Sequence, residues 1–273
     1  MTGATSIQFG AALAAQLFDD LGPAGTSLLR LGFASPILLL LWKPRIASYS
    51  RSELRLAAVF GLALGVMNLA FYLALDRIPL GIAVTIEFAG PLGVAVFASR
   101  RRLDLAWAAL AAIGIVLLAD PGGGSLDALG LFFIAIAAGC WAAYILLAQR
   151  AGGVFTGAKG LALASVVAAL VPLVPGVVQG GDDLLKPGLL AAGLGVALLS
   201  SVIPYSLEQE ALRRIPAHVF SVLMSLEPAI AALAGFLVLG QSLGTRACIA
   251  IALVVFASIG ITRSSSSAPV LDG

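Results

Sequence analysis

The amino-acid sequence predicts an all-α integral membrane protein with ten transmembrane helices arranged as two inverted five-helix repeats. Three observations lead to this fold class: the composition, the spacing of long apolar segments and an internal repeat. Of the 273 residues, 60% are hydrophobic and only 11% are charged, whereas a soluble domain carries roughly 25% charged residues. Too few charges remain to cover a water-exposed surface, which argues against a soluble enzyme, a nucleic-acid-binding domain or an extracellular receptor domain.

Charged residues, glycines and prolines divide the chain into ten apolar segments. A transmembrane helix needs roughly 20 apolar residues, so ten helices use about 200 residues and leave only short connections. The segments are too long and too uniformly apolar for the alternating strands of an outer-membrane barrel. The first begins at Met1 without preceding basic residues, so we interpret it as a helix lacking its first turns, with the true start upstream, and not as a signal peptide. The segments cover residues 2–18, 24–42, 54–75, 80–98, 104–119, 126–147, 157–178, 188–207, 217–239 and 244–262.

Lysine and arginine residues are distributed unevenly between the connections. Twelve of the sixteen lie near the connections that follow even-numbered segments or after the last segment, and three lie on the opposite side. Arg30 lies inside the second segment. Because cytoplasmic loops carry the excess of positive charge, we expect both termini in the cytoplasm, which requires an even number of spans.

The sequence contains no motif for a metal, a nucleotide or a redox cofactor. Its two cysteines, Cys140 and Cys248, lie in separate apolar segments, and His218 is the single histidine. No CxxC, HExxH or GxxxxGK[ST] pattern occurs, and these are the motifs of metal and phosphate sites. We therefore expect no cofactor, no metal and no ATP-binding domain in this chain. The net charge of +2 also argues against a nucleic-acid partner, and the expected partner is the lipid bilayer.

Each half of the chain carries the same short pattern. Arg77-Ile78-Pro79 recurs as Arg214-Ile215-Pro216, and a further proline follows each tripeptide after twelve residues, as Pro91 and Pro228. Five spans per half is an odd number, so the halves would cross the membrane in opposite orientations, as they do in many secondary transporters. We expect a first repeat over residues 1–123, a second over residues 124–263 and a disordered cytoplasmic tail over residues 264–273.

Two carboxyl groups lie deep in the apolar segments. At 1.5 Å per residue, Glu87 lies about 11 Å into the fourth segment and Glu227 about 15 Å into the ninth. A charge near the middle of an apolar layer about 30 Å thick costs on the order of 3 kcal/mol, so each acid must face the interior, find a partner or hold a proton. At the repeat offset, Glu87 aligns with Met224 and Glu227 with Gly90. Both acids are candidate substrate- or proton-binding groups, and tying helices together is the alternative role.

Pro91 and Pro228 lie close to these acids. A proline removes the hydrogen bond to the carbonyl four residues earlier, which frees the carbonyls of Glu87 and Met224. A broken helix at membrane depth is tolerated where it lines a cavity. The prolines therefore mark a candidate site, and a simple packing kink is the alternative interpretation.

Further polar side chains interrupt the apolar segments. Arg30 either neutralises a membrane carboxylate or extends to the membrane surface. Asn68 and Tyr72 share one helix face, as do Tyr205 and Glu208, and each pair is either part of a binding site or hydrogen-bonded to neighbouring helices.

The sixth and third segments hold features that we interpret as structural. Trp141 and Tyr144 are more typical of packing than of a binding site. Gly61-x-x-x-Gly65 is a small-residue motif for close helix contact, either within the chain or in a homodimer.

Several longer motifs are distributed along the chain. They are Pro79-Leu-Gly-Ile-Ala-Val-Thr-Ile-Glu-Phe-Ala-Gly-Pro91, Ser99-Arg100-Arg101, Gly139-Cys-Trp-Ala-Ala-Tyr144, Gln149-Arg-Ala-Gly152, Pro204-Tyr-Ser-Leu-Glu208 and Met224-Ser-Leu-Glu-Pro-Ala229. Together they resemble the EamA-type members of the drug/metabolite transporter superfamily and, more narrowly, the threonine/homoserine exporter (RhtA-type) branch. The resemblance covers nearly the whole chain. It implies ten helices in two inverted repeats, and a central cavity lined by the third, fourth, eighth and ninth helices. The implied lining residues are Asn68, Tyr72, Glu87, Tyr205, Glu208, Ser225 and Glu227.

The same resemblance implies a function. It predicts a secondary active transporter of the bacterial inner (plasma) membrane that exports small amino acids such as threonine or homoserine in exchange for protons. Export of a drug or another metabolite is the alternative within the superfamily. A non-transporting scaffold or sensor, or a membrane enzyme, is the alternative from another class. Two acids at mid-membrane argue against a scaffold, and the sequence shows no cluster of catalytic polar residues that favours an enzyme.

Overall fold

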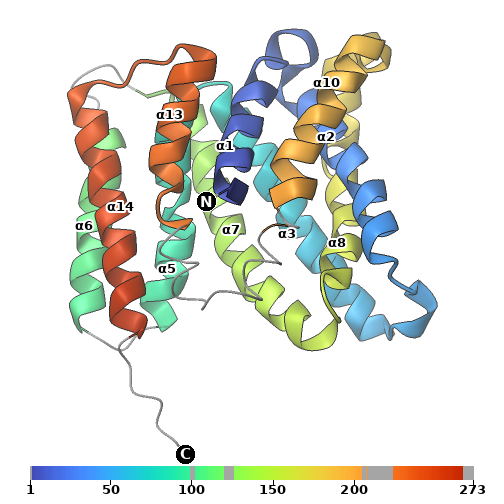
Figure 1. The fold of residues 1–273 in the computed structure, drawn as a ribbon, viewed down its shortest axis with the longest axis horizontal. Helices are drawn as coiled ribbons and strands as arrows, with labels where there is room; N and C mark the ends of the chain where they lie inside the picture. The colour runs from blue at the N-terminus through green and yellow to red at the C-terminus, as the bar shows by residue number, and fades with distance from the viewer. Residues whose placement is uncertain (1, 99–101, 120–125, 205–206, 208–223, 267–273) are drawn as a thin grey trace, which may run out of the picture.

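The chain forms a bundle of helices (Figure 1). The computed structural model describes residues 2–98, 102–119, 126–204, 207 and 224–266, and all regular secondary structure in these ranges is helical. This confirms the predicted all-α class.

The first half of the chain supplies the helices α1 to α6. A Gly22 backbone with φ of 65° bends α2 between the first two predicted segments. Ser50 and Glu53 form a capping box that begins α3, because each side chain pairs with the backbone N–H of the other residue. The bounds are α1 Thr2–Ala15, α2 Phe18–Trp42, the 3₁₀ turn η1 Ile46–Ser48, α3 Arg51–Leu75, α4 Leu80–Glu87, α5 Ala89–Ala98 and α6 Arg102–Ala119.

The second half of the chain supplies the helices α7 to α10, α13 and α14. The described elements are α7 Ala128–Val154, α8 Lys159–Leu170, α9 Leu173–Gly180, the 3₁₀ turn η3 Gly181–Leu185, α10 Pro187–Ala197, the π-helical turn η4 Leu198–Val202, α13 Glu227–Leu239 and α14 Thr245–Ser266.

Several predicted segments differ from the structure: α2 begins at Phe18, six residues before its predicted start, and α7 continues to Val154, seven residues past its predicted end. The segment predicted over 80–98 is interrupted at Phe88, between α4 and α5. The segment predicted over 157–178 is bent by 48° between α8 and α9, where Pro172 cannot donate a backbone hydrogen bond. The tail predicted from residue 264 begins too early, because α14 continues to Ser266. Serine has a helix propensity close to that of many other residues, so the serines extend the last turn.

Long apolar helices are present among the described residues. Phe18–Trp42, Arg51–Leu75 and Ala128–Val154 are each long and apolar enough to cross a membrane, and the bent pair of α8 and α9 adds a fourth such stretch if it counts as one span. Large apolar side chains also cover the outside of the bundle, including Phe97 and Val178. An exterior of this kind suits contact with lipid, since extended apolar surface is rare on soluble monomers.

Small residues allow the helices to approach closely. A side chain at Gly61 would collide with the backbone of Ala164 in α8, and one at Gly65 would press against Ala168. The small-residue motif is therefore used inside the chain, between α3 and α8. In α4, a Cβ at Gly81 would lie 2.8 Å from the Cα of Ala232 in α13, so α4 and α13 also pack closely.

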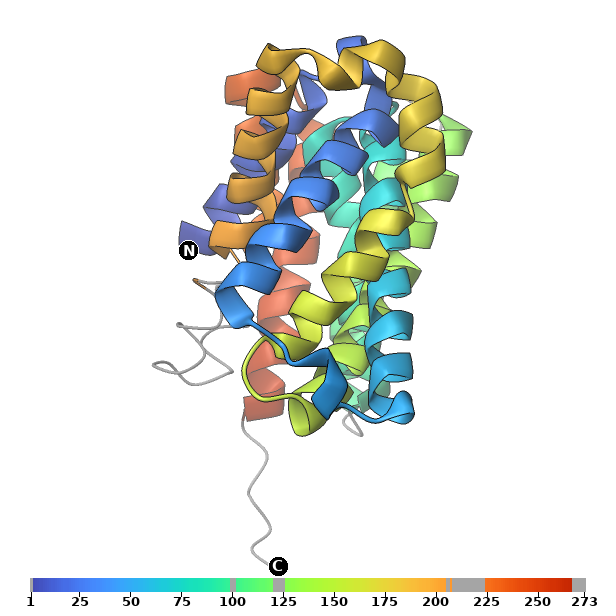
Figure 2. The same ribbon diagram turned by 90° about the vertical axis from the view of Figure 1, so that its right-hand side faces the viewer.

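Connections gather at the two ends of the bundle. Lys43 and Arg45, which follow α2, line one hollow together with Lys159 at the start of α8, and Figure 2 shows the two connections at the same end. Asp127, which caps α7, forms an ion pair with Arg77 at an N–O distance of 3.5 Å. The pair joins the connection between α3 and α4 to the start of α7.

Candidate functional site

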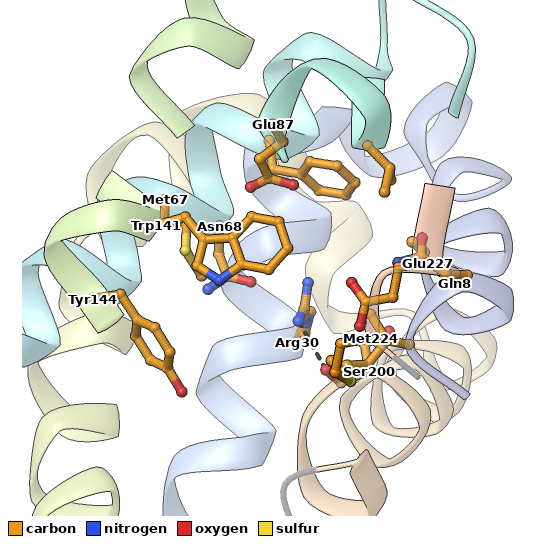
Figure 3. A pocket seen from close by; sticks show the side chains of 14 residues that line it. Gln8, Arg30, Met67, Asn68, Glu87, Trp141, Tyr144, Ser200, Met224 and Glu227 are labelled. Carbon is orange, nitrogen blue, oxygen red and sulfur yellow. Dashed lines mark hydrogen bonds between the residues drawn. The ribbon is translucent and has the colours of Figure 1, made fainter. Parts of the chain in front are cut away.

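A cavity that contains several polar side chains lies between the helices of both halves (Figure 3). Its volume is about 130 Å³, and a single water needs roughly 10–15 Å³ on this measure. The cavity therefore has room for a small solute with several polar groups. It is lined by Ile7, Gln8, Ala11, Arg30, Met67, Asn68, Phe71, Val84, Glu87, Trp141, Tyr144, Ser200, Met224 and Glu227.

Glu87 enters the cavity from the last turn of α4. Glu87 is only 8% exposed. The helix is interrupted at Phe88, and α5 begins at Ala89. Phe88 packs edge-on against Trp141, with ring centroids 5.2 Å apart. Pro91 lies in the first turn of α5, three residues after the break. The interruption therefore places the carboxyl group at the end of a short helix, beside the cavity.

Glu227 enters from the start of α13. It is 3% exposed, and Pro228 follows it in the first turn of the helix, where the missing N–H is not needed. A helix N-terminus carries a partial positive charge that stabilises a nearby carboxylate. Met224, the repeat equivalent of Glu87, lines the same cavity. The described residues of both halves thus place a helix end beside the same cavity.

Arg30 of α2 projects into this cavity from within the bundle. It is 6% exposed, so it does not extend to the membrane surface, and that alternative is wrong. Its Nε donates to Ser201 Oγ at 3.2 Å and its Nη2 to the Ser200 carbonyl at 2.9 Å. Its Nη1 donates to the Tyr72 hydroxyl at 3.2 Å, and the guanidinium carbon lies 5.3 Å from the Tyr72 ring centre. These contacts hold a positive charge at a defined place in the apolar interior.

Glu87 and Glu227 are directed into the same cavity as Arg30 (Figure 3). Arg30 is also within electrostatic range of the Glu87 carboxyl group. The structure therefore brings together a cation and two acids that lie 57 and 197 residues away from it in the sequence. Such a set can bind a small zwitterion, since the cation pairs with a carboxylate and the acids with an ammonium group.

The other predicted site residues take different positions. Asn68 lines the cavity and its amide donates to the Leu64 carbonyl at 2.7 Å. Tyr72 is fully buried behind Arg30 and is not a lining residue. Ser225 is 2.7 Å from the hydroxyl of Ser258 on α14 and does not line the cavity. Tyr205 and Glu208 lie outside the described residues.

Among the lining residues whose side chains carry a polar group, sequence reasoning missed four. Gln8 and Ser200 were not singled out, although each is a polar residue inside a predicted apolar segment, which is the signal that identified Asn68. Trp141 and Tyr144 were interpreted as packing residues. They do pack, Tyr144 against Phe60 with ring centroids 5.2 Å apart, but they also form the wall of the cavity opposite Glu227 (Figure 3).

The sequence is similar to a family of known transporters. Residues 128–263 match the EamA-like transporter family. The threonine/homoserine exporter RhtA of Salmonella typhimurium strain LT2 is 42% identical over 268 residues, which cover 97% of this chain and 90% of the relative. The threonine/homoserine exporter RhtA of Escherichia coli strain K12 is 41% identical over 273 residues, with 98% and 92% coverage. A crystal structure that is 20% identical in sequence has a TM-score of 0.59 over 97% of this chain and 99% of the other, which is a similarity of fold alone.

Proposed function

Because this chain belongs to the EamA-like transporter family, in the RhtA-type branch of the drug/metabolite transporter superfamily, we propose that it exports a small amino acid such as threonine or homoserine in exchange for protons. The protein is a transporter and not an enzyme, as its relatives are exporters. The substrate and the coupling to protons are the parts that we propose.

The observation that carries this proposal is the grouping of Arg30, Glu87 and Glu227 around one cavity. An amino acid presents a carboxylate and an ammonium group at a short, constant separation. The guanidinium of Arg30 suits the carboxylate, because arginine presents several donors in a planar arrangement. The two acids suit the ammonium group. All three are at least nine-tenths buried, so little water competes for them.

The same acids supply a route for coupling to protons. Burial in apolar surroundings disfavours the ionised form of a carboxyl group, and a nearby positive charge favours it. An ionised Glu87 attracts the substrate ammonium, whereas a protonated Glu87 releases it. One carboxyl group can therefore carry either a proton or the substrate, which links the two flows in opposite directions. Glu227 is the second candidate for this role.

We propose ten spans in two inverted repeats, over residues 1–123 and 124–263, with alternating access by movement of one repeat against the other. The packing of the helices supports this. α1 packs against α13 and α4 against α7, while α2 packs against α10 and α3 against α8. Exchange of the two repeats converts the contact between α1 and α13 into the contact between α7 and α4. It likewise converts the contact between α2 and α10 into the contact between α8 and α3. Phe88 and Ser225 are also equivalent positions, 137 residues apart, and the backbone forms a turn at both.

We propose that both termini lie in the cytoplasm of a bacterium, with the protein in the inner membrane. The connections that hold Lys43, Arg45 and Lys159 meet at one end of the bundle, which supports a single positively charged face. Cytoplasmic faces of membrane proteins carry such an excess.

The direct test is uptake by inside-out vesicles from cells that express the protein. With an imposed proton gradient, we expect labelled threonine or homoserine to accumulate above the level of vesicles without the protein. Dissipation of the gradient should abolish the accumulation. A panel of other metabolites and drugs serves as comparison, and transport of these alone would refute the amino-acid proposal.

A further inference from the structure

We propose that Gln8 and Ser200 form a subsite for the side-chain hydroxyl of the substrate, so that the cavity selects hydroxylated amino acids over apolar amino acids of the same shape. The proposal rests on the proposed function, because it concerns the same cavity. It goes beyond that function by assigning a part of the substrate to two residues outside the Arg30 and glutamate set.

Gln8 lines the cavity and carries an unpaired acceptor. It lies on α1, is 3% exposed and lines the cavity together with Ile7 and Ala11. Its Oε1 atom is buried and has no hydrogen-bond partner among the described residues. A buried amide without a partner is costly, so a ligand that donates a hydrogen bond there recovers free energy on binding.

Ser200 presents an unpaired hydroxyl from the opposite half of the chain. It is 1% exposed, and its Oγ atom has no partner among the described residues. Gly10 of α1 makes room for this hydroxyl, because a Cβ at position 10 would overlap the Oγ atom. The contact brings α1 against η4, and Figure 3 shows Gln8 and Ser200 on the same side of the cavity as Glu227.

The backbone at Ser200 departs from a regular α-helix where the residue lines the cavity. Ser200 lies in the π-helical turn η4, and single π turns occur often at functional sites. Two carbonyls of this turn accept side-chain hydrogen bonds: Ser6 Oγ donates to the Leu199 carbonyl at 2.6 Å, and Arg30 donates to the Ser200 carbonyl at 2.9 Å. The backbone of Ser200 is thus held in place, while its side-chain hydroxyl has no partner among the described residues.

The two atoms together match a hydroxyl group. A hydroxyl both donates and accepts hydrogen bonds, so it can donate to Gln8 Oε1 and accept from the hydroxyl of Ser200. Arg30 and the acids bind groups that all amino acids share, and they cannot distinguish one side chain from another. Threonine and valine have nearly the same shape, but valine leaves both buried polar atoms unpaired. Sites of this kind reject the analogue that lacks the hydroxyl far more strongly than apolar pockets can.

The test compares threonine with valine at equilibrium and in transport. Binding of each amino acid to the purified protein in detergent is measured by calorimetry, and competition against labelled threonine is measured in inside-out vesicles. For the unmodified protein we expect threonine to bind at least about 100-fold more tightly than valine. Gln8→Leu and Ser200→Ala should each reduce this ratio by roughly 10-fold or more.

Ser165→Ala is the matched control. Ser165 is a buried serine of α8 that bonds to Ala162 and Ser35 away from the cavity, and its removal should leave the ratio unchanged. If both cavity variants bind threonine with an unchanged ratio, the subsite is refuted while the proposed function stands. If the unmodified protein binds no amino acid at all, the proposed function fails and the subsite with it. Loss of the preference in both variants, with binding of valine retained, supports the subsite.

Discussion

Replacement of Arg30 by methionine should destabilise the bundle, because Arg30 joins elements from the two halves of the chain. The change leaves an unbranched apolar side chain but removes the charge and all donors. It leaves the Ser200 carbonyl, the Tyr72 hydroxyl and the Ser201 hydroxyl without their donor, and it removes a cation–π contact. The tie between α2, α3 and η4 is thereby lost.

The size of the effect follows from the number of bonds. Side-chain hydrogen bonds in membrane proteins contribute on average about 0.6 kcal/mol each, which amounts to about 2 kcal/mol for three bonds. Bonds to charged groups contribute roughly 1.5–3 kcal/mol in other proteins, but burial of the guanidinium opposes this gain. We therefore expect a loss of about 2–5 kcal/mol in the free energy of unfolding.

The assay is unfolding of the purified protein in detergent, followed by circular dichroism. Arg45→Met is the matched control, because Arg45 is exposed beyond the end of α2 and such changes stay within about 0.5 kcal/mol. A double-mutant cycle with Tyr72→Phe then isolates the bond between the two side chains. Equal stability of Arg30→Met and Arg45→Met would refute the structural role of Arg30.

Three further outcomes are expected. Glu87→Gln should fold and insert but lose proton-driven export, because the amide cannot ionise; vesicles that retain substrate-coupled proton movement would transfer the role to Glu227. Gly61→Leu should unfold at a lower temperature than the unmodified protein, because α8 leaves no space for a side chain at position 61. Gly139→Ala is the control: the space around position 139 is open, so this change should be neutral or slightly stabilising. A reporter fused after Arg263 should respond as cytoplasmic and one in the 120–127 connection as periplasmic, and opposite sides for the two termini would contradict ten spans.

The sequence by itself determined the class of the protein and its most unusual positions. The shortage of charges already required an apolar environment, and the cost of an isolated charge in that environment identified Glu87, Glu227 and Arg30 as residues with a special role. The covalent restriction of proline is equally local, which is why the pattern around Pro91 marked a segment that the structure interrupts at Phe88.

Only the tertiary structure decided which side chains share the cavity. In a soluble protein, the apolar stripe of a helix identifies its buried face. Here lipid and protein interior are both apolar, so the uniformly apolar segments around Gln8 and Ser200 carry no such stripe. The π turn at Ser200 and its contact with Gly10 depend on helices nearly 200 residues apart, and no local pattern encodes that approach. The orientation of a helix about its own axis in a membrane is set by packing against its neighbours, which is why the binding surface emerged only from the folded bundle.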